Sequence, residues 1–294
     1  MAGRALISVA ASMALLTASA DAATIHVKPG PNAIQKAVDK ADPGDRLLVK
    51  RGIYREDVLV DKRLRIIGKS GKPPVINGRC RTDRVIDVVA DRVTLRHLKV
   101  KGAESDPGNG YTLNLIGIES GTFRDLVLRD SCNVNPAYYG LNVFDTGALD
   151  ITGVTASGGY IDAGIYVGSI GDVGSRPFRI ARNKTVRNNI GILIEDSVPG
   201  ANILVRDNVA RMNETNGLST PAGILVRRSD GGRYIDNVAN RNGEYGIHLL
   251  DDGGNTADDN VLIGNTATLN GTADFLDQGT GNCGSGNSFP IDPC

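Results

Sequence analysis

One seven-residue pattern occurs four times between residues 182 and 270, and its regular spacing constrains the fold more than any other feature. The copies RNKTVRN, DNVARMN, DNVANRN and GNTATLN begin 25, 29 and 28 residues apart. Each copy holds two asparagines five positions apart, such as Asn183 and Asn188. A repeat of this length is too short to bury an apolar face alone, so it indicates units that stack into a solenoid.

The recurring asparagines predict the corners of such a coil. A stacked Asn can hydrogen-bond the backbone of its own turn and the Asn of the next turn, and it tolerates a left-handed φ. Asparagine spacing alone therefore predicts structure rather than binding.

A second repeat has Gly, an apolar residue, a variable residue and another apolar residue. Its glycines lie 23, 24, 27, 32 and 23 residues apart, which fits one strand per coil with loops of varying length. The glycines are Gly117, Gly140, Gly164, Gly191, Gly223 and Gly246. Since side chains alternate along a strand, two columns should point inward: Ile118, Leu141, Ile165, Ile192, Ile224 and Ile247, then Val143, Val167, Ile194, Val226 and Leu249.

The first part of the chain supplies a cap and further strands. Asn32 can cap a helix through Ala41, with Ile34, Ala37 and Val38 on one apolar face. From Asp45 on, short apolar and β-branched runs alternate with turn residues, and no helical pattern recurs between them. The sequence therefore predicts an all-β coil of parallel strands, with residues 24–44 as its N-terminal cap.

Residues 1–23 have the features of a signal peptide: Arg4, an apolar run rich in small residues, and small-x-small cleavage patterns. We expect an exported protein, secreted, periplasmic or on the cell surface, whose β-helix domain spans residues 24–294 without a membrane span. Lys+Arg and Asp+Glu both number 33, so overall charge gives no reason to expect nucleic acid or a membrane surface as a partner.

Export permits disulfides among the four cysteines. A Cys283–Cys294 bond would close the Gly/Asn/Pro-rich tail of residues 283–294, contributing about 3 kcal/mol. Cys80 and Cys132 are left as the second pair, provided that their coils stack. Metal ligation is the alternative, although no C-x-x-C spacing supports it.

Several segments carry a family resemblance: PGDRLLVKRGIYREDVLV, VIDVVADRVTLRHLKVKG and NGEYGIHLLDDGGNTADDN. They resemble exported bacterial right-handed parallel β-helix repeat proteins of the pectin-lyase-like superfamily, and are similar to the accessory β-helix proteins of nitrous oxide reductase assembly. The resemblance covers about residues 24–285 and implies a single right-handed parallel β-helix, a solenoid with a short N-terminal capping helix. Because this fold carries lyases, hydrolases, esterases, epimerases and non-enzymatic proteins, it implies no particular reaction.

The outward positions of the glycine repeat are the expected place for a site, because sister families hold polysaccharide along one parallel sheet. The first predicted outward column is Glu119, Asn142, Tyr166, Leu193, Leu225 and His248. The next is Phe144, Gly168, Glu195, Arg227 and Leu250, followed at the turn by Asp145, Ser169, Asp196, Arg228 and Asp251. The leucines suggest that a loop or partner covers part of this face.

Acid–base chemistry on a uronate needs a base, an acid and a cation. The catalytic candidates are Tyr166, Glu195, Arg227 and His248, and the substrate-binding candidates are Tyr166, Asp196, Arg228 and Asp251. Ca²⁺ between the carboxylates is an open option without a specific motif. The competing interpretation, which we favour, is that Glu195 and Arg227 form a surface ion pair between coils.

Two functional hypotheses follow. The first is an exported protein that binds a polysaccharide along the sheet. A stronger version of this hypothesis is that the protein also modifies the polysaccharide. The second is a non-catalytic structural or accessory protein of the cell envelope. Tyr111, Tyr138 and Tyr139 would stack on sugars or pack at corners, and the three scattered histidines disfavour a multi-histidine copper site. The oligomeric state stays open.

Overall fold

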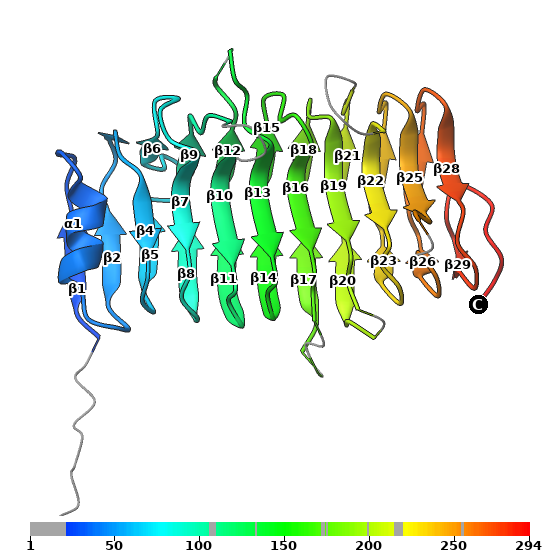
Figure 1. Ribbon diagram of the computed structural model, residues 1–294, viewed down its shortest axis with the longest axis horizontal. Coiled ribbons are helices and arrows are strands. Elements are labelled where there is room, and N and C mark those ends of the chain that lie inside the picture. Colours follow the sequence, from blue (N-terminus) through cyan, green and yellow to red (C-terminus); the bar gives the residue numbers. More distant parts are fainter. Residues whose placement is uncertain are drawn as a thin grey trace, which may run out of the picture.

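The computed structural model describes residues 22–294 except 106–109, 133, 172–173, 175, 199, 215–219 and 254–255. Nearly all of the predicted signal peptide (residues 1–23) lies outside these residues. In the described part, the chain winds through three parallel sheets in strict rotation, so that each strand pairs with its equivalent one coil away (Figure 1). The predicted all-β parallel β-helix is confirmed.

Sheet A contains β1 (Thr24–Val27), β2 (Arg46–Val49), β5 (Arg65–Gly68), β8 (Val93–Arg96), β11 (Ser120–Arg124), β14 (Ala148–Thr152), β17 (Phe178–Ala181), β20 (Ile203–Arg206), β23 (Arg233–Ile235), β26 (Val261–Ile263) and β29 (Cys283–Ser285). Sheet B contains the short strands β3 (Ile53–Tyr54), β6 (Val75–Asn77), β9 (Lys99–Lys101), β12 (Val127–Arg129), β15 (Thr155–Ser157), β18 (Lys184–Val186), β21 (Val209–Arg211), β24 (Val238–Asn240) and β27 (Thr266–Thr268). Sheet C contains β4 (Val58–Val60), β7 (Arg84–Val88), β10 (Tyr111–Ile116), β13 (Tyr139–Phe144), β16 (Ala163–Gly168), β19 (Ile190–Glu195), β22 (Ala222–Arg227), β25 (Tyr245–Leu250) and β28 (Ala273–Asp277).

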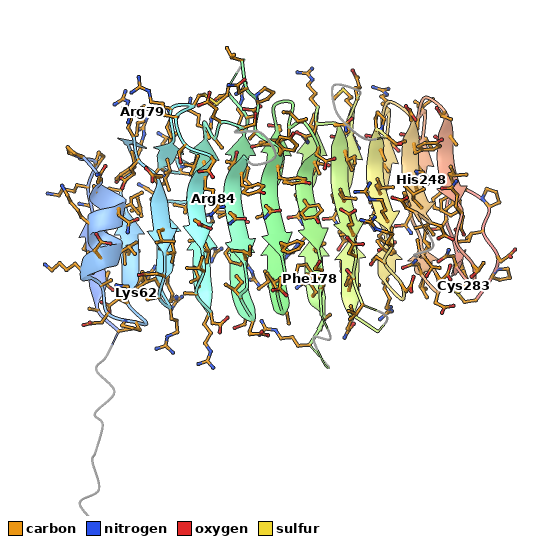
Figure 2. The ribbon with its side chains drawn as sticks, viewed as in Figure 1. Lys62, Arg79, Arg84, Phe178, His248 and Cys283 are labelled. Atoms are coloured by element: carbon orange, nitrogen blue, oxygen red, sulfur yellow. A yellow bond between two sulfur atoms is a disulfide. The ribbon has the colours of Figure 1, made fainter. Side chains whose placement is uncertain are left out.

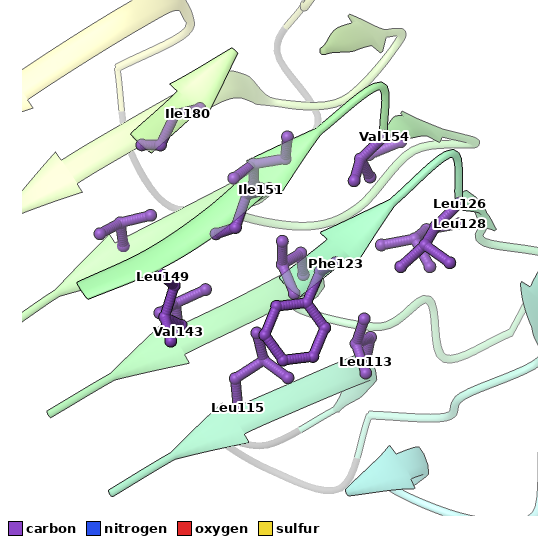
Figure 3. Packing of buried hydrophobic residues seen from close by; sticks show 14 of the residues in the cluster. Leu113, Leu115, Phe123, Leu126, Leu128, Val143, Leu149, Ile151, Val154 and Ile180 are labelled. Carbon is purple, nitrogen blue, oxygen red and sulfur yellow. The ribbon is translucent and has the colours of Figure 1, made fainter. Parts of the chain in front are cut away.

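The core lies inside the coil, where one or two apolar side chains of most strands stack on their equivalents in neighbouring coils. Leu113 and Leu115 of β10 face Phe123 of β11 across this interior (Figure 3). Ile192 and Ile194, predicted to point inward, are fully buried in it. Burial of each such side chain stabilises the fold by roughly 1.5–3 kcal/mol.

Helix α1 (Ala33–Lys40) covers the N-terminal end of the coil, as predicted (Figure 1). The predicted cap is wrong, however, because Asn32 has a left-handed φ of 49° and its side chain makes no capping bond. The buried Glu56 carboxylate instead accepts the backbone N–H groups of Ile34 (3.1 Å) and Gln35 (2.9 Å). An anion from the next coil thus satisfies free donors at the helix start.

The asparagine repeat forms the predicted ladder at the coil corners. The Asn208 amide nitrogen donates to Oδ1 of Asn237 (2.9 Å) and to the backbone oxygen of Ile180 (3.0 Å). A second ladder runs through Asn213 and Asn242 (3.0 Å). The left-handed residue is the one before each asparagine, such as Asp207 (φ 55°), so that part of the prediction is wrong.

Most glycines of the repeat lie against the second asparagine ladder, whereas Gly140 lies against Tyr160. A Cβ on Gly223 would lie 2.6 Å from the amide nitrogen of Asn242, and one on Gly246 would lie 2.6 Å from that of Asn270. These glycines therefore leave room for the amides. Gly117 does not belong to this repeat, because the strand that pairs with β13 is Tyr111–Ile116 and Gly117 follows it with a φ of 63°.

Both predicted disulfides are present. Cys283 and Cys294 close the tail with Cα atoms 4.9 Å apart, and the Cα atoms of Cys80 and Cys132 are 5.7 Å apart. Cys80 follows β6 and Cys132 follows β12, whereas the coil of β9 lies between these two strands. The second bond therefore spans an intervening coil rather than adjacent ones. In the described part of the chain, no helix is long and apolar enough to cross a bilayer.

Candidate functional site on the outer face of sheet C

The outward columns of sheet C are largely as predicted. Strand register aligns Asn142, Tyr166, Leu193, Leu225 and His248 in one column. It aligns Phe144, Gly168, Glu195, Arg227 and Leu250 in the next. Glu119 is wrongly placed in the prediction, because Asn114 pairs with Asn142 and Glu119 lies in the turn after β10.

Glu195 is the centre of a charged cluster at the C-terminal end of these strands. Its carboxylate forms ion pairs with Arg227 (Nη2–Oε1 2.5 Å) and with Nη2 of Arg228, and the Tyr166 hydroxyl hydrogen-bonds to it. Arg228 also forms an ion pair with Asp196 (Nε–Oδ1 2.7 Å). The expected Glu195–Arg227 pair between coils is therefore present, and Tyr166, Asp196 and Arg228 join it. We name these five residues the Glu195 cluster.

Burial sets the proton affinities in this cluster. The Glu195 side chain is 7% exposed, and desolvation raises the pKa of its carboxyl although Arg227 opposes the rise. Desolvation, with the nearby charges of Glu195 and Asp196, also raises the pKa of the Tyr166 hydroxyl far above its usual value. The tyrosine therefore stays protonated and donates, while Glu195 is a better proton acceptor than an exposed carboxylate.

A row of tyrosines leads along the sheet to this cluster. The ring centroids of Tyr111 and Tyr139 are 5.8 Å apart, and those of Tyr139 and Tyr166 are 4.6 Å apart, both pairs being stacked. The Tyr139 hydroxyl donates to Asp162 (2.8 Å). Since the rings stack on one another, Tyr111 and Tyr139 pack between coils.

Polar side chains form a ladder beside the tyrosines in the N-terminal half of the sheet. The Asn142 amide donates to Asn114 (2.7 Å), and the Asn114 amide donates to Asp87 (2.7 Å). Asp87 also accepts from Arg84 (Nη1–Oδ2 3.2 Å), which Figure 2 labels on this face, toward the opposite end of the coil from His248. The positions of Asp87 and Asn114 in this ladder were not predicted from the sequence, because both residues precede the recognised repeat.

Exposed apolar side chains lie at the end of the same strands. Ile116 and Phe144 pair in register and are 40% and 39% exposed, and Val89, just after β7, is 44% exposed. We name Val89, Ile116 and Phe144 the apolar strip. Beyond Phe144 the column continues with Gly168, over which the Tyr166 hydroxyl lies, and then with Glu195. The strip therefore leads directly into the Glu195 cluster.

Leu193 and Leu225 on this face are buried by neighbouring side chains of the same sheet, and their coverage by a loop or partner stays a prediction. Leu193 is 0% and Leu225 is 1% exposed. Together with Tyr166, Ile190 and Ala222 they form an apolar cluster separate from the interior core. Tyr166 belongs to both clusters, so the outer apolar cluster adjoins the Glu195 cluster directly.

Two predicted site residues do not join the Glu195 cluster. The His248 ring packs at a tilt against Tyr245, with the ring centroids 4.5 Å apart, and its Nε2 bonds to Gln278 (3.1 Å). Burial lowers the pKa of its imidazole, so it is neutral at pH 7. Asp251 accepts the backbone N–H of Ala257 (2.8 Å), and it is Asp252 that approaches Arg228 (3.6 Å).

A hollow of about 780 Å³ adjoins the N-terminal ends of the strands of sheet C. Thr82 and Asp83 before β7, and Tyr138 and Ile161 before β13 and β16, are among its lining residues. The tyrosine row thus has polar, open space beside it.

Metal donors are dispersed over the described chain. All four cysteines are in disulfides. His26 lies in β1, and Nδ1 of His97 lies 3.6 Å from Asp125, far along the coil from His248. Among the residues described, no three His, Cys, Asp or Glu side chains come together as a potential metal site.

The fold and the outer face of sheet C define the class of protein. It is a right-handed parallel β-helix with polar and apolar side chains arranged along the outside of one sheet. A family model described as "Periplasmic copper-binding protein (NosD)" matches residues 97–290. The chain belongs to this family.

Solved structures share the fold at low identity. An alginate lyase from Paenibacillus sp. str. FPU-7 is 17% identical with a TM-score of 0.57, over 92% of this chain and 97% of that one. The pectate lyase Pel9A is 14% identical with a TM-score of 0.57, over 91% of this chain and 78% of that one. ORF18 of Geobacillus virus E2 is 14% identical with a TM-score of 0.59, over 87% and 58%. A comparison with curated proteins gave no match.

Proposed function

We propose that this protein is exported and binds a polysaccharide chain along the outer face of sheet C. The observation that carries the proposal is the apolar strip leading directly into the Glu195 cluster. Sugar rings have apolar faces that pack on exposed side chains such as Phe144, and hydroxyl groups that bond to fixed polar groups. A chain lying parallel to the coil axis would meet both along one line.

The charge of this face favours a neutral glycan. Arg84 is paired with Asp87, Arg227 with Glu195, and Arg228 with Asp196. A uronate chain would have to displace one of these carboxylates, whereas sugar hydroxyls can add to the existing pairs. We therefore assign neutral polysaccharide to sheet C.

A second candidate function is lyase-like modification of a uronate at the same place, favoured by the contact of Tyr166, Glu195 and Arg227. Glu195 would take the proton from the carbon next to the uronate carboxyl group. The C4–O bond would break as a C4=C5 double bond forms, and Tyr166 would protonate the leaving oxygen. Arg227 would neutralise the substrate carboxylate after leaving Glu195.

Copper does not enter this proposal, although the family is described as copper-binding. Copper sites use His, Cys or Met ligands that converge. The cysteines are in disulfides, and the histidines of the described chain lie apart. These residues do not fit a copper centre, so a non-catalytic accessory role, if present, would act through a surface of the coil.

The test is affinity electrophoresis of the mature protein through gels containing a panel of neutral glycans and polygalacturonate. We expect retardation by at least one neutral glycan, and about tenfold weaker retardation for Phe144→Ala. The matched control is Val134→Ala, since Val134 is 88% exposed away from the strands and should not matter. Equal retardation of both variants, or none on any neutral glycan, would disprove the binding proposal.

The modification candidate needs a separate readout. The protein is incubated with each uronate, with and without Ca²⁺, and unsaturated products and new reducing ends are measured. Products that disappear in Glu195→Gln, while the variant stays folded, would support the lyase-like reaction. Absence of products with every uronate leaves the non-catalytic binding function.

A further inference from the structure

The outer face of sheet B carries a line of cations. The outward residues of its strands include no Asp or Glu among those described. We name its six cationic residues the basic strip: Lys99, Lys101, Arg129, Lys184, Arg187 and Arg211. They come from β9, β12, β18, β21 and the corner after β18, so the strip follows the coil axis. Lys101 and Arg129 pair in register on adjacent strands, about 4.8 Å apart, so these two like charges are held close together.

These cations differ from several arginines elsewhere on the coil that are paired with acids. Arg96 pairs with Asp125 (3.2 Å), Arg206 with Asp207 (2.8 Å), and Arg228 with Asp196 (2.7 Å). In the described part of the chain, no residue of the basic strip forms an ion pair. Since the whole protein has a formal net charge of zero, this strip is a local concentration of charge and not a general excess.

The basic strip is also hollowed. One cavity of about 460 Å³ is lined by Lys99, Lys101, Arg129, Asp130, Ser131 and Gly158. The next, of about 300 Å³, shares Arg129 and Gly158 with the first and extends to Thr155, Ser157, Lys184 and Arg187. The two therefore form one continuous groove.

A separate hollow lies further along the same sheet, and the described lining of all three hollows holds few acids. A third hollow of about 330 Å³ has Arg211 and Arg241 in its lining. Asp130 is the acid in the lining of the three, and it is 5% exposed and accepts the backbone N–H of Cys132 (2.9 Å). It is therefore held by the backbone and not by the cations.

We propose that this groove on sheet B binds an acidic polysaccharide, a linear chain bearing carboxylate or sulfate groups. The cations would pair with its acidic groups, and the hydroxyls of Ser131, Thr155 and Ser157 would bond to its sugar hydroxyls. The lining of the first two hollows holds no aromatic ring on which bases could stack, which disfavours single-stranded nucleic acid. A concave groove also suits a chain better than a flat lipid surface.

The proposal concerns a different sheet from the proposed function and stands independently of it. Its test is binding of fluorescently labelled polygalacturonate to the mature protein between 50 and 300 mM salt. Arg129→Gln with Lys184→Gln should weaken binding at least tenfold and flatten the salt dependence, because fewer counterions are released. Both side chains are exposed, so the double variant should fold, and its melting temperature verifies this.

The matched control removes the same charge from sheet A, where Arg46 and Arg65 are exposed neighbours in register. Arg46→Gln with Arg65→Gln should change affinity less than twofold. Equal weakening by both double variants would mean that only net charge matters, and would overturn the proposal. Absence of binding at 50 mM salt would overturn it as well.

Two further arms identify the polyanion. Heparin should compete with polygalacturonate, since both carry acidic groups on a sugar chain. If duplex DNA or phosphatidylglycerol vesicles bind more tightly than both and depend on Arg129 and Lys184, the assignment to acidic polysaccharide is wrong. Phe144→Ala on sheet C should leave polygalacturonate binding unchanged, which separates the outcome from that for the neutral glycan.

Discussion

The outer faces of sheets B and C belong to the same coil and cover the same kind of interior, yet they differ in nearly every other property. Sheet C has strands of up to six residues, and its outward Leu193, Tyr166 and Glu195 are buried and partnered. Sheet B has strands of two or three residues, and its outward Arg129 and Lys184 are exposed cations without acidic partners in the described chain. The interior columns specify the fold, whereas each outer face can acquire its own chemistry.

The largest expected difference concerns apolar positions. Leu193→Asp on sheet C should destabilise the protein by about 3–5 kcal/mol, nearly as much as Ile192→Asp in the core, because both create an unpaired buried carboxylate. Val209→Asp on the outer face of sheet B should cost less than about 1 kcal/mol, since the residue is only partly buried. Urea unfolding of the three variants checks this. Wild-type stability of Leu193→Asp would mean that the outer apolar cluster is not formed.

A smaller difference is expected for arginines. Arg227→Ala should cost about 1–3 kcal/mol at pH 8, because it leaves the buried Glu195 carboxylate with one fewer partner. Arg129→Ala on sheet B should be neutral or slightly stabilising, since it relieves repulsion.

The Arg227 effect should depend on pH in a defined direction. Burial already raises the pKa of Glu195 in the folded state, and loss of Arg227 raises it further. The folded state then binds the proton more tightly than the unfolded chain, so stability falls as pH rises above about 4.5. Melting temperatures at pH 5 and pH 8 should therefore diverge more for Arg227→Ala than for wild type. An equal deficit at both pH values would show that Glu195 is not the affected group.

The smallest effect concerns Asp130, the acid in the basic groove. Burial raises the pKa of its carboxyl to about 6, despite opposing backbone N–H bonds from Cys132 and others. Because the folded pKa exceeds the unfolded value of 3.8, stability is lost as pH rises from about 4 to about 6. The pKa difference corresponds to about 3 kcal/mol at most. Asp130→Asn should recover about 1–2 kcal/mol of it at pH 7, because nearby solvent screens this group and the amide replaces the backbone hydrogen bonds less well. Thermal melts across pH 4–8 check it, and an unchanged profile would contradict the assignment.

The sequence predicted the interior of the coil because the interior obeys two local rules, alternation along a strand and repetition every 23–32 residues. Both rules are visible in residues such as Ile192 and Asn208. The same repetition gave a wrong strand prediction at Gly117. A Gly-Ile pair in a turn matches the repeat there, whereas the actual strand begins at Tyr111. The correct strand could have been found from the spacing between Arg84 and Tyr111 and between Asp87 and Asn114, which pair in register.

The site was partly predictable for the same reason. Tyr166, Glu195, Asp196, Arg227 and Arg228 meet because three consecutive coils stack in register. That His248 and Asp251 lie outside the Glu195 cluster was not predicted. Their partners, Gln278 and the Ala257 backbone, are set by loop conformations that no sequence pattern specifies. The basic strip could have been found from Lys101 and Arg129, which occupy the same outward position 28 residues apart.

The asparagine columns have one more consequence, which concerns electrical polarity. Every amide donates toward the C-terminal coil, from Asn183 to Asn208 (3.0 Å) and from Asn213 to Asn242 (3.0 Å), so the side-chain dipoles add. Aligned dipoles leave a partial positive charge at their donor end, as in an α-helix. In the column of Asn213 and Asn242, the last amide is Asn270, which donates to the Asp274 carboxylate (2.8 Å). In the column of Asn183 and Asn208, Asn265 instead donates to the neutral amide of Asn287 (3.0 Å). One of the two amide columns thus ends on a negative charge, which offsets the partial positive charge at its donor end.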